Sequence, residues 1–180
     1  MLPQDIYNSQ HRNIGQREVG ISDGGDNKHR LICRYGCIED VEEVVQLWKK
    51  LASMGCHNRT TKYDIQTLEI LKKQIISKIS EDIRNLIVVV DKWRIIAFLF
   101  GYIIVDPIRK GVIAQIDSLY VEPEYRGKGI GSQLIKYFIE DSRKRNATEV
   151  NLCVVSDNPA VKIYKKLGFR VWQLTLRMEI

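Results

Sequence analysis

A glycine-rich turn flanked by cations is the stretch of this 180-residue sequence that is best suited to chemistry. The turn reads RGKGIG over residues 126–131, follows a β-leaning apolar run, and opens directly into a helical pattern. Glycines permit positive φ and a close approach of the backbone to a ligand. The first N–H groups of a helix lack intrahelical partners and lie at the positive end of its dipole. The turn therefore predicts a binding site for phosphate or pyrophosphate.

The spacing of the glycines separates this turn from two common phosphate-binding motifs. GxxxxGK followed by Ser or Thr is absent, and the glycines do not fit GxGxxG within a βαβ unit. The pattern Arg126-x-x-Gly129-x-Gly131 instead resembles the R/Q-x-x-G-x-G/A signature of the GNAT acetyltransferases, in which the turn binds the pyrophosphate of acetyl-coenzyme A. The resemblance implies that the pyrophosphate is held by Arg126, Gly127, Lys128, Gly129, Ile130, Gly131 and Ser132.

A second segment, nearer the C-terminus, carries the same resemblance. Residues 157–169 read DNPAVKIYKKLGF, in which Asn158 is placed to start a helix of about nine residues and Gly168 to end it. The segment is similar to the N-P-A-x-x-L-Y-x-K-x-G-F stretch of many GNAT enzymes, with Ile163 in place of the Leu. The resemblance implies that Asn158 helps to hold the pantetheine arm or the strand splay, and that Tyr164 lies near the coenzyme A sulfur.

The family reaction, direct attack of a neutral amine on the acetyl thioester, makes three chemical demands. The amine must lose a proton, because an alkylammonium has a pKa of about 10.4. The thioester oxygen needs stabilisation, and the departing thiolate needs a proton donor. Tyr164 is predicted to be that donor, with a core tyrosine as the alternative interpretation. Backbone groups of Leu119, Tyr120 and Val121 are expected to meet the thioester oxygen and the pantetheine amides, with the help of a β-bulge.

Asp117 is the predicted catalytic base. It stands on the strand before the turn, where related enzymes often carry Glu. Its carboxylate would deprotonate the amine through a water molecule or help to bind a cationic substrate. Ser118 and Glu122 are the alternatives, and a solvated strand Asp without a catalytic role is a further interpretation.

Hydrophobic periodicity predicts the elements that position these residues. Helical periods cover residues 39–52, 65–79, 130–145 and 159–167, and strand patterns cover residues 31–35, 86–90, 94–105, 112–121, 150–155 and 169–180. This order matches the GNAT topology: an α/β fold with a mixed, mostly antiparallel sheet of six to seven strands flanked by about four helices. Residues 31–180 are expected to form the single GNAT domain. Residues 1–30 are polar and are expected to form an arm that is flexible or packs on a partner subunit.

Composition and charge exclude several classes of protein. The net charge of +6 is dispersed among acidic residues, so nucleic-acid binding is not expected. The longest apolar run, residues 95–105, is too short to cross a membrane. The four cysteines, Cys33, Cys37, Cys56 and Cys153, have no paired metal-ligand spacing, so no metal site and free thiols in a cytoplasmic protein are expected. The polar arm and an exposed last strand would allow a homodimer.

The sequence therefore predicts an acetyl-coenzyme A-dependent N-acetyltransferase acting on a primary amine. The acceptor is a protein N-terminus or lysine, or a small-molecule amine. A loop over residues 53–63 contains His57, Arg59 and Lys62, which mildly favours an acceptor with a carboxylate or an acidic peptide. The alternative function is a non-catalytic acyl-coenzyme A sensor or partner subunit, against which the intact Tyr164 and glycine-rich turn argue.

Overall fold

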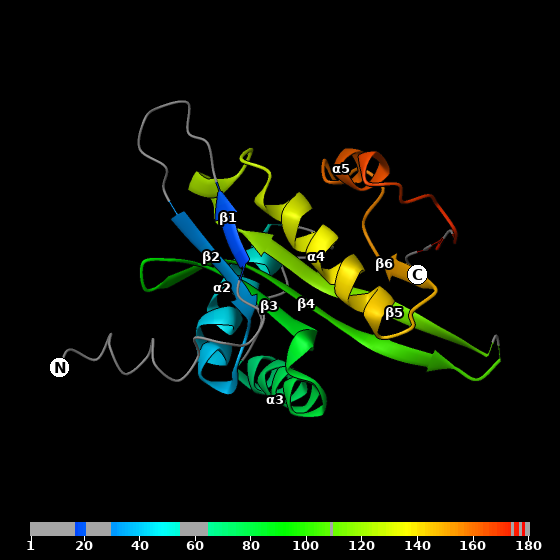
Figure 1. Cartoon of the computed structure of the whole chain (residues 1–180), viewed down its shortest axis with the longest axis horizontal. Coiled ribbons are helices and arrows are strands. Elements are labelled where there is room, and N and C mark those ends of the chain that lie inside the picture. Colours follow the sequence, from blue (N-terminus) through cyan, green and yellow to red (C-terminus); the bar gives the residue numbers. More distant parts are fainter. Residues whose placement is uncertain are drawn as a thin grey trace.

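One mixed β-sheet carries helices on both of its faces (Figure 1). The computed structural model describes residues 17–20, 30–54, 65–108, 110–173, 175–176 and 178. In this part of the chain the strands follow the order β1-β2-β3-β4-β5-β6, and every pair is antiparallel except β5–β6. The strands are β1 (Arg17–Gly20), β2 (Arg30–Tyr35), β3 (Leu86–Asp91), β4 (Arg94–Asp106), β5 (Gly111–Val121) and β6 (Glu149–Leu152).

Among the described residues, four α-helices and three short 3₁₀ turns connect the strands. The helices are α2 (Val41–Ser53), α3 (Ile65–Glu81), α4 (Ile130–Lys144) and α5 (Val161–Lys166), and the turns are η1 (Ile38–Asp40), η2 (Ile83–Asn85) and η3 (Pro123–Tyr125). Acidic residues occupy the first turn of α2 and basic residues the last turn of α4, as the helix dipole favours. The predicted α/β class with a mixed sheet and four helices is therefore confirmed.

Helices α2 and α3 cover one face of the sheet with a helical apolar stripe. Val44 and Val45 of α2 and Ile75 of α3 are buried against Phe98 and Tyr120 of the central strands. The strands in this layer are rich in β-branched and aromatic residues, which suit a buried pleated surface. This face of the sheet, with α2 and α3 on it, is called the α2/α3 face below.

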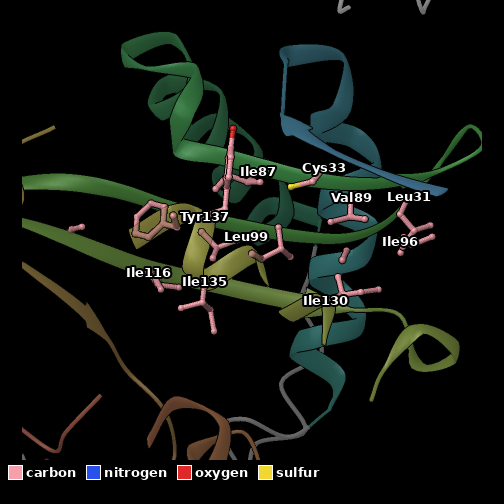
Figure 2. Close-up of a cluster of buried hydrophobic side chains, with 14 residues drawn as sticks. Leu31, Cys33, Ile87, Val89, Ile96, Leu99, Ile116, Ile130, Ile135 and Tyr137 are labelled. Atoms are coloured by element: carbon pink, nitrogen blue, oxygen red, sulfur yellow. The ribbon is translucent and has the colours of Figure 1, made fainter. Parts of the chain in front are cut away.

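Helix α4 covers the opposite face, where a second cluster of apolar side chains is buried (Figure 2). Ile130, Ile135 and Tyr137 of α4 pack with strand residues that include Ile87 and Leu99. Helix α5 lies on the same side, because Tyr164 packs against this cluster (Figure 1). This face is called the α4/α5 face below, and the two clusters together hold the strands between them in a fixed orientation.

A β-bulge in β5 reverses which of its residues face each layer. Phe100 of β4 pairs with Ser118, but Gly101 pairs with Ile116, so Asp117 is the extra residue. Before the bulge, Ile116 packs in the α4/α5 cluster; after it, Tyr120 packs in the α2/α3 cluster. A strand without the bulge would place both on the same face. The expected bulge therefore exists, and it lies at Asp117.

Two expectations about the ends of the chain need correction. Residues 17–20, within the expected arm 1–30, form β1 and pair with β2, while the rest of that arm lies outside the described residues. The closing strands expected within residues 169–180 are not formed at the described positions, namely 169–173, 175–176 and 178. Alternating apolar residues suggested them, but Val171 and Trp172 stand 78% and 77% exposed rather than paired on the sheet.

Candidate active site

The glycine-rich turn has the backbone conformation that its composition requires. Gly127 and Gly129 have φ of 77° and 82°, values that L side chains rarely adopt. A Cβ at either position would meet nothing within 4 Å, so conformation rather than crowding demands glycine there. The turn therefore presents open backbone at the start of α4.

The first turn of α4 leaves its amide groups available to a ligand. Gly129 is the N-cap, and the first intrahelical bond runs from the Gln133 N–H to the Gly129 carbonyl at 3.0 Å. The N–H groups of Ile130, Gly131 and Ser132 precede that bond and have no carbonyl one turn earlier. No acidic residue lies in this turn and no side chain caps it, so a pyrophosphate would meet no competing anion.

The end of β5 lies directly beside this turn. A Cβ on Gly131 would lie 3.8 Å from Cγ2 of Val121 and 3.9 Å from Cδ2 of Leu119. The first turn of α4 therefore packs on the side chains at the end of β5. These two segments, predicted separately as parts of the site, are thus adjacent.

In the described part of the chain, the outer edge of β5 is open beyond Ile116. β6 pairs with β5 only as far as Leu152 opposite Ile116, and the chain then turns away towards α5 (Figure 1). The Glu122 N–H bonds to the carbonyl of Ile96 on β4 at 2.9 Å. Because N–H groups alternate along a strand, those of Leu119 and Val121 point to the other side, into this opening. Such N–H groups are suited to a thioester oxygen or a pantetheine amide.

Arg126 folds back onto β5. Its Nε donates to the carbonyl of Val121 at 2.8 Å, and its guanidinium carbon lies 5.5 Å from the centroid of the Tyr120 ring. Its Nη2 lies 3.2 Å from the sulfur of Met54, just after α2. Lys128, the other cation of the turn, places its Nζ 5.7 Å from the centroid of the Tyr125 ring. The two cations of the motif therefore lie in different surroundings.

Glu122, one of the alternative bases, is occupied by other partners. Its carboxylate is buried and accepts hydrogen bonds from Nζ of Lys50 at 2.5 Å and from the hydroxyl of Tyr120 at 3.0 Å. Burial, followed by the hydrogen bond and the charge of Glu122, raises the pKa of Tyr120. The link from Lys50 to Glu122 ties the end of α2 to the end of β5. No local pattern in the sequence signals this link, because the two residues are 72 positions apart.

Asp117 stands exposed on the bulge, with Ser118 buried beside it. The hydroxyl of Ser118 donates to Oδ2 of Asp117 at 2.6 Å, which fixes the orientation of the carboxylate. Burial, and then the charge of Asp117, raises the pKa of Tyr102 on β4. Ser118 is thus placed to orient Asp117 rather than to replace it.

The C-terminal motif forms a capped helix on the α4/α5 face. The side chain of Asn158 accepts a hydrogen bond from the Ala160 N–H at 2.8 Å and so shapes the turn that precedes α5. Gly168 has φ of 96°, and the Phe169 N–H bonds to the Tyr164 carbonyl at 3.0 Å, which makes a Schellman C-cap. The helix spans six residues rather than the expected nine or so.

Tyr164 shares its core cluster with the end of β5. The ring of Tyr164 is half-buried, and its centroid lies 6.0 Å from the centroid of the Phe169 ring. Tyr164 packs against the same cluster as Leu119 and Val121. The described structure therefore brings the donor candidate, the strand end and the glycine-rich turn to one face. Asp117 lies at the bulge of the same strand.

Other features of the described chain lie apart from this site. A cavity of about 350 Å³ is found at the C-terminal end of α4, the end away from the glycine-rich turn, and Arg84 and Arg145 are among its lining residues. Among the described residues, no group of three or more His, Cys, Asp or Glu could hold a metal ion, and no helix is long and apolar enough to cross a membrane. Cys37 and Cys153 are free thiols, and Cys33 is buried. Cys56, His57, Arg59 and Lys62 lie outside the described residues.

Comparison with known proteins identifies the same stretch of chain. The sequence profile of the acetyltransferase (GNAT) family matches residues 47–169. An uncharacterised N-acetyltransferase of Methanocaldococcus jannaschii is 41% identical over 66 residues, which are 36% of this chain and 29% of that protein. Thialysine N-epsilon-acetyltransferase of Sus scrofa is 43% identical over 56 residues, 31% of this chain and 33% of that protein. The matches thus span about a third of these relatives.

The fold also has relatives among solved structures. A putative acetyl transferase from Pyrococcus furiosus superposes with a TM-score of 0.63 and 23% identity, over 79% of this chain and 95% of that one. At this identity the likeness concerns the fold alone.

Proposed function

Because the chain belongs to the acetyltransferase (GNAT) family, we propose that it is an acetyl-coenzyme A-dependent N-acetyltransferase that acts on a primary amine. The observation that carries this proposal is the packing of the first turn of α4 against Leu119 and Val121. A group of anion-binding amides thereby adjoins an open strand edge. A thioester joined to a pyrophosphate is a ligand that would use both.

The glycine-rich turn would hold the pyrophosphate through its backbone. The amides of Ile130, Gly131 and Ser132 and the dipole of α4 supply fixed positive charge, and Lys128 supplies a further cation beside them. The pantetheine arm would then run along the open edge of β5, past Val121 and Leu119. Asn158 would act by fixing the turn that sets α5 against this edge.

The residues of this chain would serve three roles in acetyl transfer. The amine nitrogen attacks the acyl carbon, the carbon–sulfur bond breaks, and the sulfur takes up a proton. The N–H groups of Leu119 and Val121 would stabilise the negative charge that develops on the acyl oxygen, whereas the N–H of Tyr120 points towards β4. The Tyr164 hydroxyl would donate the proton to the sulfur, since α5 is held against the same face as the strand end.

Asp117 would take the proton from the amine, directly or through water. Its carboxylate is exposed on the bulge and oriented by Ser118, so it can be reached by an acceptor from solvent. An ammonium with a pKa near 10.4 must be deprotonated before it can attack, and a carboxylate at this position also attracts the cation. Helices cover both faces of the sheet, so the acceptor would reach Asp117 at the exposed bulge.

A thiol-release assay tests this proposal. Purified protein is mixed with acetyl-coenzyme A and a panel of peptides and small amines, and free thiol is followed for the wild type and Tyr164→Phe. We expect acceptor-dependent release that falls at least tenfold in the variant, which corresponds to about 1.4 kcal/mol of barrier. Tyr137→Phe is the matched control, because it removes a hydroxyl from α4 in the same core cluster.

Three results would contradict the proposal or one of its parts. Coenzyme A binding without release across the panel would favour the alternative function, a sensor or partner subunit that binds acyl-coenzyme A. Absence of coenzyme A binding would refute the site itself. Equal loss of release in Tyr137→Phe and Tyr164→Phe would show that the effect of the hydroxyl is on folding, and would remove Tyr164 as the donor.

A further inference from the structure

We propose that the side chain of Arg126 is a positioning group for acetyl transfer, which fixes the last peptide of β5, and that it is not a ligand of the pyrophosphate. This inference rests on the proposed function, since the peptide matters to catalysis only if the thioester binds beside it. Arg126, the first residue of the R-x-x-G-x-G pattern, would thus hold the strand in place, while the other residues of the turn would bind the cofactor.

The contacts of Arg126 place its guanidinium on the α2/α3 face of the sheet. The group lies over the ring of Tyr120, whose side chain belongs to the α2/α3 cluster, and reaches Met54 at the end of α2. The free amides of α4 begin on the opposite face. A guanidinium held against Tyr120 and Met54 is therefore directed away from the place where the amides would bind phosphate.

The peptide between Val121 and Glu122 is anchored on both sides of the strand. Its N–H donates to the carbonyl of Ile96 on β4 at 2.9 Å, and its C=O accepts from Nε of Arg126 at 2.8 Å. Because β6 has ended by this point, no strand among the described residues pairs with that carbonyl at the open edge. Arg126 thus takes the place of the missing strand for one hydrogen bond.

Anchoring this peptide sets the direction of the Val121 N–H. The N–H and the anchored carbonyl belong to the same residue, so only the backbone torsions of Val121 separate them. A donor that already points at a developing oxyanion stabilises it without reorganisation. Loss of the anchor would therefore lower the rate of acetyl transfer more than it weakens the binding of coenzyme A.

A neighbouring network braces the same strand end. The ring of Tyr120 lies under the guanidinium, its hydroxyl donates to Glu122, and Glu122 accepts from Lys50 of α2. Arg126 and Lys50 thereby connect the end of β5 to α2 at two points. The strand end is therefore braced from the α2/α3 face.

The identity of the donor atom gives a sharp test. In arginine Nε is the fourth side-chain atom from Cα, and in glutamine the amide nitrogen Nε2 is also the fourth. Arg126→Gln keeps a donor at that distance but removes the charge, whereas Arg126→Ala removes both. A role on the Val121 carbonyl thus predicts rescue by Gln.

The experiment compares wild type, Arg126→Ala, Arg126→Gln and the control Lys136→Gln, which removes a positive charge from the exposed face of α4. Three quantities are measured: the Kd of coenzyme A, the kcat of acetyl transfer, and amide hydrogen exchange in the segment that contains Leu119 to Glu122. For Arg126→Ala we expect kcat to fall about tenfold or more and exchange to become faster, with Kd changed less than about threefold. Arg126→Gln should restore most of the kcat and most of the protection from hydrogen exchange.

Each other outcome overturns the proposal in a recognisable way. A Kd that rises tenfold or more in both variants, with a reduced salt dependence, would make Arg126 a phosphate ligand. Unchanged kcat and exchange in Arg126→Ala would show that the contact has no consequence. If the wild type transfers no acetyl group, the proposed function fails, but the exchange comparison of Ala with Gln still decides whether Arg126 anchors the strand.

Discussion

Replacement of Arg34 by Met should destabilise the protein strongly and in a pH-dependent way. Arg34 on β2 makes a bidentate pair with Asp40, with distances of 2.6 and 2.9 Å, and the two side chains are only 5% and 1% exposed. Met fills a similar space but donates no hydrogen bond. The substitution therefore leaves a buried carboxylate whose remaining partners are the N–H and thiol of Cys37.

The size of the effect follows from the burial of the pair. Removal of one partner from a buried ion pair costs about 3–5 kcal/mol, because the other charge stays uncompensated. For a protein of this size each kcal/mol lowers the melting midpoint by about 2–4 °C, so we expect a fall of about 6–20 °C. Because the double variant Arg34→Met/Asp40→Asn contains no buried charge at this site, it should recover a large part of the loss.

The sign of the pH dependence distinguishes this cause from simple loss of packing. Burial alone would raise the pKa of Asp40, but the hydrogen bonds and charge of Arg34 outweigh it and hold the pKa below its usual value. In the wild type the pair therefore stabilises above the unfolded pKa of about 3.9, and the contribution is lost as pH falls through the lower folded value. In Arg34→Met only the hydrogen bonds from Cys37 still oppose the effect of burial, so we expect the folded pKa of Asp40 to rise above the unfolded one.

Urea unfolding of both proteins at pH 7 and at pH 4.5 measures this difference. In the variant the buried, charged carboxylate of Asp40 lowers the free energy of unfolding most at pH 7. This loss shrinks as the pH falls through the raised pKa, so the difference in free energy of unfolding between wild type and variant should be smaller at pH 4.5. The reasoning would be refuted if the variant lost less than about 1 kcal/mol of unfolding free energy at pH 7, or if its difference from the wild type were the same at both pH values.

Two further substitutions probe the site and the core behind it. Gly129→Ala should lower the free energy of unfolding by about 1–2 kcal/mol, because φ is 82° and a Cβ there has open space, so backbone strain alone acts. An unchanged urea midpoint would show that the turn relaxes to another conformation. Phe138→Ala should cost about 3–5 kcal/mol, since the ring is fully buried between α4 and the sheet. A loss near 1 kcal/mol would indicate that the neighbouring side chains collapse into the space.

Local features of the sequence were sufficient for much of the fold and for the backbone of the site. Periods of apolar residues located α2, α3 and α4, because a helix must place its apolar stripe on the sheet. Gly168 was recognisable as the end of α5, because a C-cap in the left-handed region favours glycine. Gly127 and Gly129 were recognisable for the same reason, which made the turn a predictable anion site.

Contacts between distant residues were beyond the reach of these local rules. Nothing in the sequence around Glu122 indicates that Lys50 will neutralise it, nor does the motif indicate on which face Arg126 will lie. Strand pairing has the same difficulty, because an alternating segment becomes a strand only where a sheet edge accepts it. Residues 171–176 alternate without pairing at their described positions, whereas residues 17–20 pair with β2.

Asp117 is the residue of β5 that has no partner of its own on β4, because Ile116 lies opposite Gly101 and Ser118 lies opposite Phe100. Deletion of Asp117 would therefore join these two pairs into a regular ladder and leave every other residue of the strand opposite its present partner. Tyr120 would keep its face, and the N–H of Val121 would still point to the open edge. An insertion between Ser118 and Val121 has no such outlet, because it would exchange the faces of the residues on one side of it unless a second bulge formed. The strand end should thus tolerate the loss of one residue at position 117 far better than the gain of one residue beyond it.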